Sequence, residues 1–417
     1  MAIEEATWMG TLPETWNTCP LKYVFSIEKR IAGKEGYTVL SITQSGIKPK
    51  NMSAQGQFAQ DYSKYQLVYP GDFAMNHMDL LTGWIDISKY EGVTSPDYRV
   101  FTNKNPEKFL SEYYKYIFQF CYSGKVFYGM GQGVSGLGRW RLPAEMFLNF
   151  RLPVPSIEEQ KTIVAYLDQH ISKIDSVIAE AKASIEEYKA WKASIIYEAV
   201  TKGLDPDVEM KDSGIEWIGT IPEHWKLEKL KRHTSMLTPM RDKPEHLDGE
   251  IPWVRIEDYC GKYIDASKEG LGVSSETVTK MNLKVYPVGT VLCTSSCDLG
   301  KCAIVSRPLV SNQRFIGIIP NANTCTDYLY YLMLSNAERL NYLSTGTIQA
   351  NLSRVAFEQL IVQIPPYNEQ EEIASYLDKK MMQVDTLIFE KQALIKDLES
   401  YKKSLIFEVV TGKRRVC

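Results

Sequence analysis

Residues 155–175 read PSIEEQKTIVAYLDQHISKID, and residues 366–385 repeat the pattern as PYNEQEEIASYLDKKMMQVD. After a one-residue slip beside the prolines, the two stretches align at a constant offset of 210 residues, which pairs Gln160 with Gln370. The matches continue without a gap as far as Thr411. So long an ungapped match indicates a tandem duplication, and the rest of the chain is interpreted from it.

Each copy, the first running from Glu158 to Thr201, has the apolar spacing of a long helix that packs along one seam. The seam consists of Val164, Leu167, Ile171, Ile174, Ile178, Ala181, Ile185, Tyr188, Ile195 and Ala199 in the first copy, and of Ala374, Leu377, Met381, Val384, Ile388, Ile395, Leu398, Leu405 and Val409 in the second. These steps of three and four are the a/d pattern of a coiled coil, interrupted by Lys192, Lys391 and Lys402. A seam this narrow favours one partner helix, so we expect the two copies to pair within the chain, each roughly 65 Å long at 1.5 Å per residue. An oligomerising coiled coil is the alternative.

Length and composition set the broad class. The chain has 417 residues, 44% of them hydrophobic and 24% charged, which predicts two or three globular domains rather than one core. No apolar run approaches the roughly 18 residues of a membrane span, and the N-terminus lacks the features of a signal peptide. Eight cysteines without framework spacing suggest reduced thiols, so we expect a cytoplasmic protein. The net charge of −3 leaves any basic surface to local patches.

A second repeat precedes each globular segment. Residues 8–16 read WMGTLPETW and residues 217–225 read WIGTIPEHW. We expect these tryptophans to pack against a neighbouring element rather than to bind a ligand. The order is therefore motif, globular segment and long helix, written twice, with domains predicted at 1–152, 153–204, 205–362 and 363–417.

The two globular segments hardly resemble each other, and both are predicted to be mixed α+β and mostly sheet. Strand-like runs lie at residues 37–42, 65–69, 251–256, 289–293 and 303–305. In the first segment only Pro106 to Tyr122 has a helical pattern, and in the second a short helix is expected from Thr326 to Ser335. The fold class is α+β, with two long helices between two mixed domains. Divergent segments on a duplicated scaffold indicate that the segments carry specificity and the scaffold carries assembly.

Several motif matches fail on their context. Gly131 to Gly136 matches GxGxxG, but no helix is expected after it, so a dinucleotide site is disfavoured. Residues 364–367 read IPPY and lack the amide of an adenine methyltransferase tetrad, and no glycine-rich cofactor loop accompanies them. Residues 206–211, PDVEMK, compress a nuclease-like pattern into a linker. With no Walker A loop either, neither methylation, cleavage nor ATP hydrolysis is assigned to this chain.

Cys293, Cys297 and Cys302, with Cys325 as a possible fourth member, form the only metal-like cysteine cluster. Their spacing of three and four residues differs from paired CxxC knuckles, and no histidine lies nearby. Free thiols on strands are favoured over a zinc site.

The paired PxxEQxxIxxYLD helices and the GxxPExW motifs resemble the specificity (S) subunit of Type I restriction-modification systems. The stretch from Ile195 to Trp225 is similar to the central conserved region of that family, and the resemblance covers the whole chain. Pro70 to Phe73 with Ser95 to Tyr98, and Gly289-Thr290 with Ser311 to Gln313, resemble weaker features of its target recognition domains. The departures lie inside these domains, notably the cysteines of the second, where members of the family differ, so the resemblance implies the assembly but not the DNA target.

The resemblance implies a non-catalytic DNA reader. Each target recognition domain would read one half of a split double-stranded DNA site, and an antiparallel helix pair would set the spacing. Two modification (methyltransferase) subunits would supply S-adenosylmethionine, and restriction subunits would add ATP- and Mg-dependent translocation and cleavage. No cofactor or metal is expected in this chain.

Polar and basic residues on loops are the candidates for DNA contact, because base edges and phosphates are bound by Arg, Lys, Asn, Gln and Ser. In the first domain they are Lys48, Lys50, Asn51, Gln55, Gln57, Lys64, Asn76, Arg99 and Gln132. In the second they are Arg241, Lys243, Arg255, Ser295, Ser296, Lys301, Gln313, Arg314, Gln349, Asn351 and Arg354. We expect about a third of them to touch DNA. The glycine-containing loops at 131–138 and 346–349 are favoured over any single residue, because glycine permits close backbone approach.

Two rival functions are kept. One is a coiled-coil scaffold or orphan specificity subunit without DNA activity, which would show no salt-sensitive, sequence-dependent retention of DNA. The other is a fused methyltransferase and reader, which would bind S-adenosylmethionine by itself.

Overall fold

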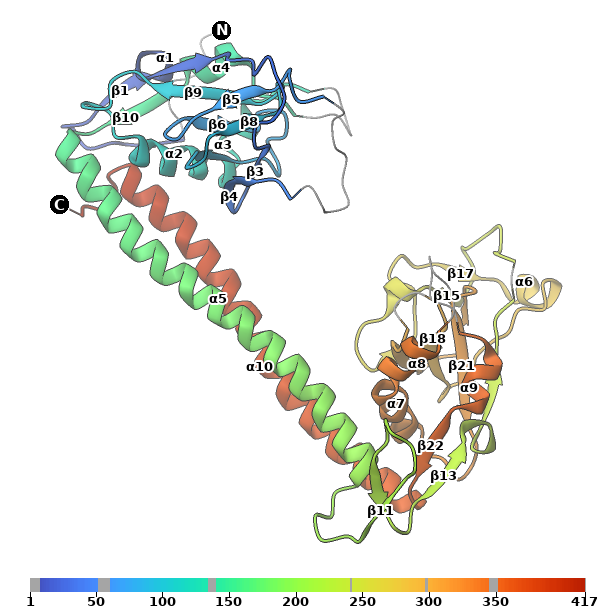
Figure 1. Ribbon diagram of the computed structural model, residues 1–417. Coiled ribbons are helices and arrows are strands. Elements are labelled where there is room, and N and C mark those ends of the chain that lie inside the picture. The colour runs from blue at the N-terminus through green and yellow to red at the C-terminus, as the bar shows by residue number, and fades with distance from the viewer. Residues whose placement is uncertain are drawn as a thin grey trace. The chain divides into compact units, whose positions relative to one another are not determined.

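The computed structural model describes residues 8–51, 61–133, 140–240, 242–296, 299–344 and 352–416. The chain divides into two compact units. One consists of Met1–Lys182 with Gln392–Cys417, and the other of Ala183–Lys391. Each unit contains one mixed α/β domain together with part of both long helices (Figure 1).

The two long helices are α5 (Ile157–Lys202, 46 residues) and α10 (Tyr367–Val410, 44 residues), and they lie side by side along their length (Figure 1). In the first unit the start of α5 packs with the end of α10, and in the second unit the end of α5 packs with the start of α10, so the pair is antiparallel. Leu167 and Leu377, which match in the repeat, are both fully buried. The predicted intramolecular pair is therefore confirmed.

The ends of α5 follow from its sequence. Ser156 and Glu159 form a capping box: Glu159 N donates to Ser156 Oγ at 3.3 Å, and Ser156 N donates to Glu159 Oε2 at 2.9 Å. Gly203, with φ of +76°, ends the helix in the left-handed conformation that glycine adopts without strain. Gly412, with φ of +70°, does the same after α10.

The first domain is built mainly from short antiparallel strands. It contains β1 (Asn17–Pro20), α1 (Leu21–Val24), β2 (Phe25–Glu28), β3 (Leu40–Thr43), β4 (Gly46–Pro49), β5 (Gln66–Val68), β6 (Phe73–Met75), β7 (Ile85–Ile87), β8 (Gly92–Thr94), β9 (Arg99–Asn103), α2 (Ser111–Ser123), α3 (Val126–Gly129), α4 (Ala144–Asn149) and β10 (Arg151–Val154). The largest sheet has the order β2-β9-β6-β7, with β3-β4, β5-β8 and β1-β10 as smaller pairs. Aromatic rings of the sheet and α2, such as Phe73, Phe101 and Phe118, form the centre of the core.

The helix expected from Pro106 to Tyr122 begins later, at Ser111, and the expectation that it would be the only helix of this segment was wrong. The segment before it folds as turns because the Asn103 side chain donates to Phe109 O at 2.6 Å and to Ser111 Oγ at 3.1 Å. The short helices α3 and α4 lack the long apolar periodicity that identified α2.

The second domain has more strands and a different topology. It contains β11 (Met210–Asp212), β12 (Thr220–Pro222), β13 (Lys226–Lys229), η1 (Leu230–Arg232), β14 (Thr234–Leu237), β15 (Ile251–Val254), η2 (Ile256–Asp258), β16 (Tyr263–Ile264), β17 (Gly272–Val273), α6 (Ser275–Lys280), β18 (Val291–Thr294), β19 (Cys302–Val305), β20 (Val310–Ser311), β21 (Phe315–Pro320), α7 (Thr326–Ser335), α8 (Ala337–Leu343), α9 (Arg354–Gln359) and β22 (Ile361–Ile364). A five-stranded sheet of order β14-β21-β18-β19-β16 lies beside a three-stranded sheet, β17-β15-β20. The helix predicted from Thr326 to Ser335 is confirmed as α7.

The same strand pair joins each domain to its long helix. β1 pairs antiparallel with β10, with Asn17 opposite Val154, and β13 pairs antiparallel with β22, with Lys226 opposite Ile364. The first strand of each pair follows a tryptophan motif and the second precedes a long helix. The duplicated sequence therefore produces a duplicated frame around two different domains. Among the residues that the structure describes, no helix is long and apolar enough to cross a membrane.

Candidate nucleic-acid interface

In the first domain, the predicted contact residues occupy different environments. Lys48, Asn51, Lys64 and Gln132 are exposed, Lys50 and Asn76 are half-buried, and Arg99 is buried. Gln132 forms an isolated antiparallel bridge with Arg141, with Gln132 N donating to Arg141 O at 2.8 Å and Arg141 N to Gln132 O at 3.0 Å. The bridge joins Gln132, near the start of the predicted 131–138 loop, to Arg141, three residues beyond that loop.

In the second domain, five of the predicted residues come together at one end of the large sheet. They are Ser295, Ser296, Lys301, Gln313 and Arg314, which flank the ends of β18, β19 and β21. Ser295 N donates to Arg314 O at 2.8 Å, and Leu352 N donates to Ser295 O at 2.8 Å. The exposed members of this group are Lys301, Gln313 and Arg314, whereas Ser296 is buried.

The remaining candidates of the second domain lie apart from that group. Arg255 pairs with Glu269 at 2.7 Å, and Arg354 pairs with Glu358 at 2.6 Å. Lys243 is exposed, with its ammonium 5.9 Å from the ring centre of Trp253. Gln55, Gln57, Arg241, Gln349 and Asn351, most of the 131–138 loop and the whole of 346–349 lie outside the described residues.

Equivalent glutamines of the two long helices hold both domains in place. Gln160 Oε1 accepts from Leu110 N at 2.7 Å, and Gln370 Oε1 accepts from Cys325 N at 2.8 Å. Leu110 and Cys325 are the N-cap residues of α2 and α7. Each glutamine thus satisfies a backbone donor at the start of a domain helix.

The side-chain amides of the same glutamines complete the contact. Gln160 Nε2 donates to Pro155 O at 3.0 Å and to Lys108 O at 3.1 Å. Gln370 Nε2 donates to Pro365 O at 3.0 Å and to Asn323 O at 3.3 Å. Both glutamines are almost fully buried, at 0% and 1% exposed, so each is fixed from three directions.

Tyrosines on the domain helices reach both long helices. Tyr113 Oη donates to Val410 O at 2.8 Å, and the hydroxyl of Tyr116 donates to Asp168. In the second unit Tyr328 Oη donates to Val200 O at 3.5 Å and to Gln363 O at 3.0 Å. Tyrosines at the third and sixth positions of each domain helix therefore grip the end of one long helix and the start of the other.

Asp378, the repeat partner of Asp168, is the centre of a small charged cluster. Tyr331 Oη donates to Asp378 at 2.5 Å, and Lys262 Nζ bonds Asp378 at 2.5 Å and Asp327 at 2.6 Å. Burial raises the pKa of Tyr331 and so does its bond to Asp378, which keeps the hydroxyl a donor. Burial opposes the charge of Lys262, but its two carboxylates prevail and raise its pKa.

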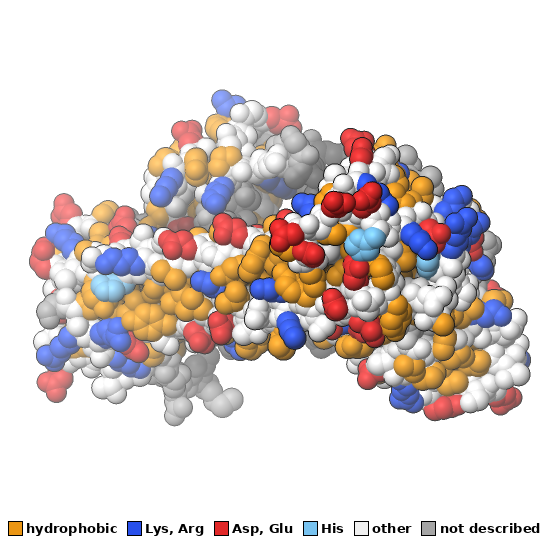
Figure 2. Space-filling view, turned by 90° about the horizontal axis from the view of Figure 1, so that it is seen from below, with side chains coloured by type: hydrophobic (Ala, Val, Ile, Leu, Met, Phe, Trp, Pro, Cys, Tyr) orange, Lys and Arg blue, Asp and Glu red, His pale blue; other side chains and the backbone are white. Residues whose placement is uncertain are grey.

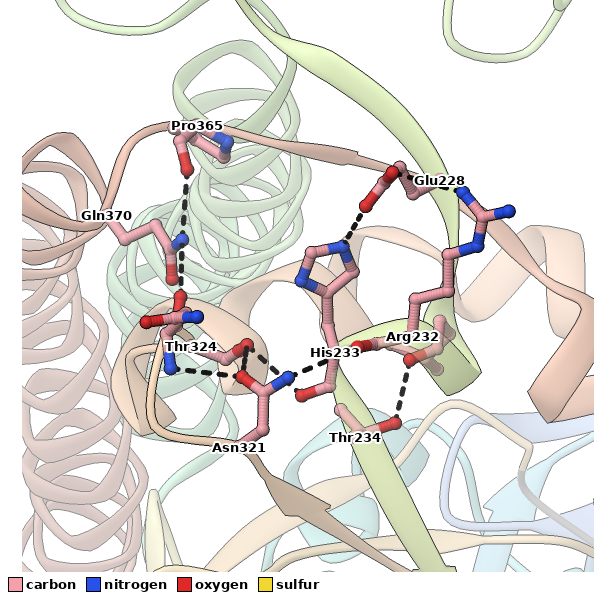
Figure 3. Close-up of polar contacts among 10 residues, drawn as sticks. Glu228, Arg232, His233, Thr234, Asn321, Thr324, Pro365 and Gln370 are labelled. Atoms are coloured by element: carbon pink, nitrogen blue, oxygen red, sulfur yellow. Dashed lines mark hydrogen bonds and ion pairs between the residues drawn. The ribbon is translucent and has the colours of Figure 1, made fainter.

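The contacts of Gln160, Tyr113 and Tyr116 form one joint between a domain and the long helices, and those of Gln370, Tyr328 and Tyr331 form the other. Figure 3 shows how the joint at Gln370 continues into the second domain. Asn321 Nδ2 donates to Arg232 O at 3.1 Å, and Thr324 Oγ1 donates to His233 O at 3.1 Å. His233 Nε2 in turn contacts Glu228 at 2.6 Å on β13. A continuous polar network thus runs from the start of α10 to the strand that enters the domain.

The tryptophan motifs pack against the starts of the long helices, as the sequence predicts. Trp16 Nε1 donates to Glu159 Oε1 at 3.1 Å, and Trp225 Nε1 donates to Glu369 Oε2 at 2.8 Å. His224 Nε2 also contacts Glu369, at 2.7 Å, where the first copy has Thr15.

The cysteines form a thiol pair. Cys293 on β18 faces Cys302 on β19 with their sulfurs 2.9 Å apart, and Cys325 lies at the start of α7. Burial raises the pKa of Cys293. Cys297 lies outside the described residues, and among those described no group of three potential ligands is arranged to hold a metal.

Comparison with known proteins identifies the family of this chain. The model of the Type I restriction modification DNA specificity domain matches residues 13–187 and again 237–397. The chain belongs to this family. The two matches correspond to the two halves of the duplication and confirm both the resemblance and the fold class.

Several proteins similar to this chain are named as specificity subunits of Type I restriction enzymes. The Type I restriction enzyme MjaIX specificity subunit of Methanocaldococcus jannaschii is 31% identical over 177 residues, which are 41% of this chain and 40% of that protein. The putative type I restriction enzyme MjaX specificity subunit of the same organism is 23% identical over 98% of this chain and 96% of its own length. The EcoR124I/EcoR124II specificity subunit of Escherichia coli is 23% identical over 54% of this chain and 53% of its own length.

Solved structures share the fold. A chain from a study of complex assembly and conformational transition of the type I R-M system superposes with a TM-score of 0.74 at 14% identity, covering 97% of this chain and all of that one. The HsdS subunit from Thermoanaerobacter tengcongensis gives 0.51 at 14% identity, covering 99% of this chain and all of that one.

The sequence predictions did not single out the tyrosines of the domain helices that contact the long helices, nor Arg141, whose backbone pairs with the candidate residue Gln132. The tyrosines had a signal, because a pair three residues apart recurs near the start of each domain helix as Tyr113 with Tyr116 and Tyr328 with Tyr331. Arg141 had none, since its position beside Gln132 depends on a bridge between residues nine apart.

Proposed function

We propose that this chain is the non-catalytic DNA-reading subunit of a Type I restriction-modification complex. The first domain, within 1–152, reads one half of a bipartite DNA site, and the second, within 205–362, reads the other. The helices within 153–204 and 363–417 set the spacing between the halves. The complex works on double-stranded DNA in the cytoplasm.

The observation that carries this proposal is the repeated joint at Gln160 and Gln370. A ruler requires stiff connections, because a domain that swivels on its helix would accept several spacings. Each joint combines a buried glutamine with three hydrogen bonds and two tyrosines that contact both long helices. Net contributions of about 1 kcal/mol per buried hydrogen bond make such a joint costly to open.

Different domains on identical joints favour unequal half-sites. The group around Arg314 offers a guanidinium and an amide at one end of a sheet, the side-chain types that read guanine and adenine in the major groove. In the first domain Lys48, Asn51, Lys64 and Gln132 present exposed polar groups on other strands and turns. Because the two sets differ, each half-site should have its own sequence.

Methyltransferase and restriction subunits bring the chemistry, with S-adenosylmethionine, ATP and Mg²⁺ bound there and not by this chain. Hydrophobic side chains lie along the surface of the paired helices (Figure 2). In the second unit they include Trp191, Met382 and Phe389, which are 49%, 67% and 71% exposed. Large apolar side chains on a narrow helix pair are suited to packing against further helices of a partner.

Insertion of seven residues into each helix tests the ruler. The insertions belong between Ala183 and Ser184 and between Ala393 and Leu394. The first site is midway between Asp175 and Lys192 and the second midway between Asp385 and Lys402, the four residues that form ion pairs between the two helices. One heptad preserves the seam and adds about 10.5 Å, so the spacing should grow by up to about 3 base pairs while both half-site sequences persist. Methylome sequencing of cells that express the variant with its partners gives the answer. An unchanged spacing excludes the ruler role.

Replacement of residues 34–150 by the corresponding domain of another family member tests modularity. One half-site should change and the other should stay as it was. If both change together, the domains are not independent readers. A chain that retains no DNA in a sequence-dependent, salt-sensitive way with its methyltransferase subunits present is a scaffold instead.

A further inference from the structure

The first domain contains a pocket of about 380 Å³, lined by both charged and apolar side chains, that the repeated frame does not explain. Its wall includes residues 96–98 of the Ser95–Tyr98 turn, Arg99 at the start of β9, His77 and Arg141. The sequence singled out this turn as a family feature without giving it a role.

Arg99 lies in the wall of this pocket as a buried cation, and the residues that the structure describes give it no anionic partner. The residue is only 5% exposed. Its Nη2 donates to Leu142 O at 3.0 Å, and its guanidinium lies 4.8 Å from the ring centre of Phe147. Nη1 is buried and has no hydrogen-bond partner within the described chain, and no carboxylate there forms an ion pair with it. Burial lowers the pKa of Arg99 to about 10; Tyr122 opposes this shift, and the positive charge of Arg141 adds to it. A desolvated charge of this kind favours an anion close by.

His77 adds a second buried polar group without a described partner to the pocket wall. The residue is 6% exposed, and Nδ1 is buried without a partner in the described structure. Burial lowers the pKa of His77 to about 3, assisted by the positive charges of Arg99 and Arg141. A negative charge in the pocket would oppose this shift, so the pKa of His77 should rise when an anion is bound there.

The mouth of the pocket is also cationic. Arg141 and Lys29 are both exposed there, and the bridge to Gln132 fixes the backbone of Arg141. Two carboxylates line the same pocket, Glu28 and Asp97, against three cationic side chains. Glu28 already accepts from Thr102 Oγ1 at 2.9 Å.

A buried amide makes the wall rigid. Gln66 is 5% exposed, and its Nε2 donates to the carbonyls of Pro96 at 2.9 Å, Tyr98 at 2.7 Å and Ser95 at 3.4 Å. A preformed wall reduces the ordering cost of binding a ligand.

We propose that this pocket binds a backbone phosphate of the first DNA half-site, with Arg141 donating to the phosphate oxygens and Arg99 supplying positive charge behind it. The inference rests on the proposed DNA-reading function and adds to it the anchor that fixes the register of the first domain. Arginine is suited to the role because its planar fork matches two oxygens of a phosphate. Phosphate contacts position a reader, whereas base contacts specify the sequence.

The test compares R141Q with K89Q, which removes the same charge from an exposed residue outside the pocket lining. DNA binding by the chain assembled with its methyltransferase subunits is measured from low to high salt. One lost phosphate contact lowers the slope of log K against log salt by about 0.9, so R141Q should show that decrease and K89Q should not. R141K should keep more of the slope than R141Q because it retains the charge. R141Q should weaken all DNA sequences alike.

A second readout does not need DNA. Inorganic phosphate should raise the unfolding temperature of the wild-type complex above that in chloride of equal ionic strength, and R141Q should lose the increase. An equal slope in R141Q and the wild type, or an equal decrease in K89Q, overturns the proposal. Phosphate stabilisation with an unchanged DNA slope also overturns it, since the pocket would then hold a free anion only. A wild-type complex that binds no DNA refutes the DNA-reading function instead, and the phosphate readout then refutes the anchor separately if R141Q keeps the stabilisation.

Discussion

Lys192 on α5 bonds Asp385 on α10 with Nζ and Oδ1 2.6 Å apart, and the repeat produces the same bond in reverse between Lys402 and Asp175, also at 2.6 Å. Both lysines interrupt the apolar seam, so on sequence grounds they weaken the helix pair. Their reciprocal ion pairs favour one alignment of the helices, because each lysine reaches its aspartate only in one antiparallel register. A polar residue at a seam position commonly specifies register at a cost in stability.

Charge reversal tests this register role. K192E should destabilise the second unit slightly, and K192E with D385K should restore most of the loss, with a coupling free energy of about 0.5 kcal/mol because both side chains are partly exposed. The measurement is a double-mutant cycle from urea unfolding at low and high salt. Coupling that is absent at low salt, or that does not fall as salt rises, contradicts the ion-pair explanation.

Removal of the Gln370 side chain should loosen the second domain. Q370A leaves the Cys325 N–H buried without its acceptor and deletes two donated bonds, at a cost of about 2 to 3 kcal/mol. The neighbouring exposed Glu371 gives a matched control, E371A, which should stay within about 0.5 kcal/mol of the wild type.

The functional readout separates a joint from a purely stabilising contact. Methylomes from cells expressing Q370A should show the same two half-sites with a wider range of spacings. A methylome with one sharp spacing, at a growth temperature where Q370A stays folded, means that Gln370 stabilises the domain without orienting it.

Acid should destabilise the first domain through His77. Its pKa is about 3 in the folded chain and about 6.5 when unfolded, so only the unfolded chain takes up the proton between these values. Stability attributable to His77 is therefore complete above about pH 6.5 and is lost as the pH falls, by up to about 1.4 kcal/mol per pH unit. Urea unfolding at pH 7, 6 and 5 measures the loss, and H77N should show a shallower decrease. Parallel decreases in H77N and the wild type assign the acid sensitivity to other groups.

The paired long helices could be predicted from the sequence because the duplication presents the same packing pattern twice. An apolar residue that recurs 210 positions later, such as Leu167 and Leu377, is under the same packing constraint twice, and both are buried. The joints were visible as matches, yet the roles of Gln160 and Gln370 were not, because their partners Leu110 and Cys325 contribute only backbone groups, which no sequence pattern marks.

The candidate interface was harder to predict. Arg99 was chosen as a basic residue expected on a loop and is buried at the start of β9, whereas exposed Arg141 was passed over. Burial in these domains depends on pairing between distant short strands, such as β6 with β9, and strands of three to five residues carry little periodic signal. Divergent domains also lack the repeat that made the frame readable.

Glycine substitutions test how closely the motifs pack on the helix ends. Gly33, Gly203 and Gly412 all have positive φ, at +70°, +76° and +70°. A Cβ at Gly33 would meet nothing within 4 Å, one at Gly203 would lie 3.2 Å from the Trp225 ring, and one at Gly412 would lie 2.5 Å from Pro13. G33A therefore isolates the backbone strain, about 1 to 2 kcal/mol for a residue with a side chain.

The three variants should consequently fall in a fixed order. G203A should cost somewhat more than G33A, and G412A should cost most, with about 1 to 3 kcal/mol added by the clash with Pro13. Free energies of unfolding from urea titration, followed by tryptophan fluorescence, provide the comparison, because Trp16 lies against the same glycine. If G412A is no worse than G33A, the motif can move away from the end of α10. The packing of the first tryptophan motif would then not be what holds the start of the chain to its end.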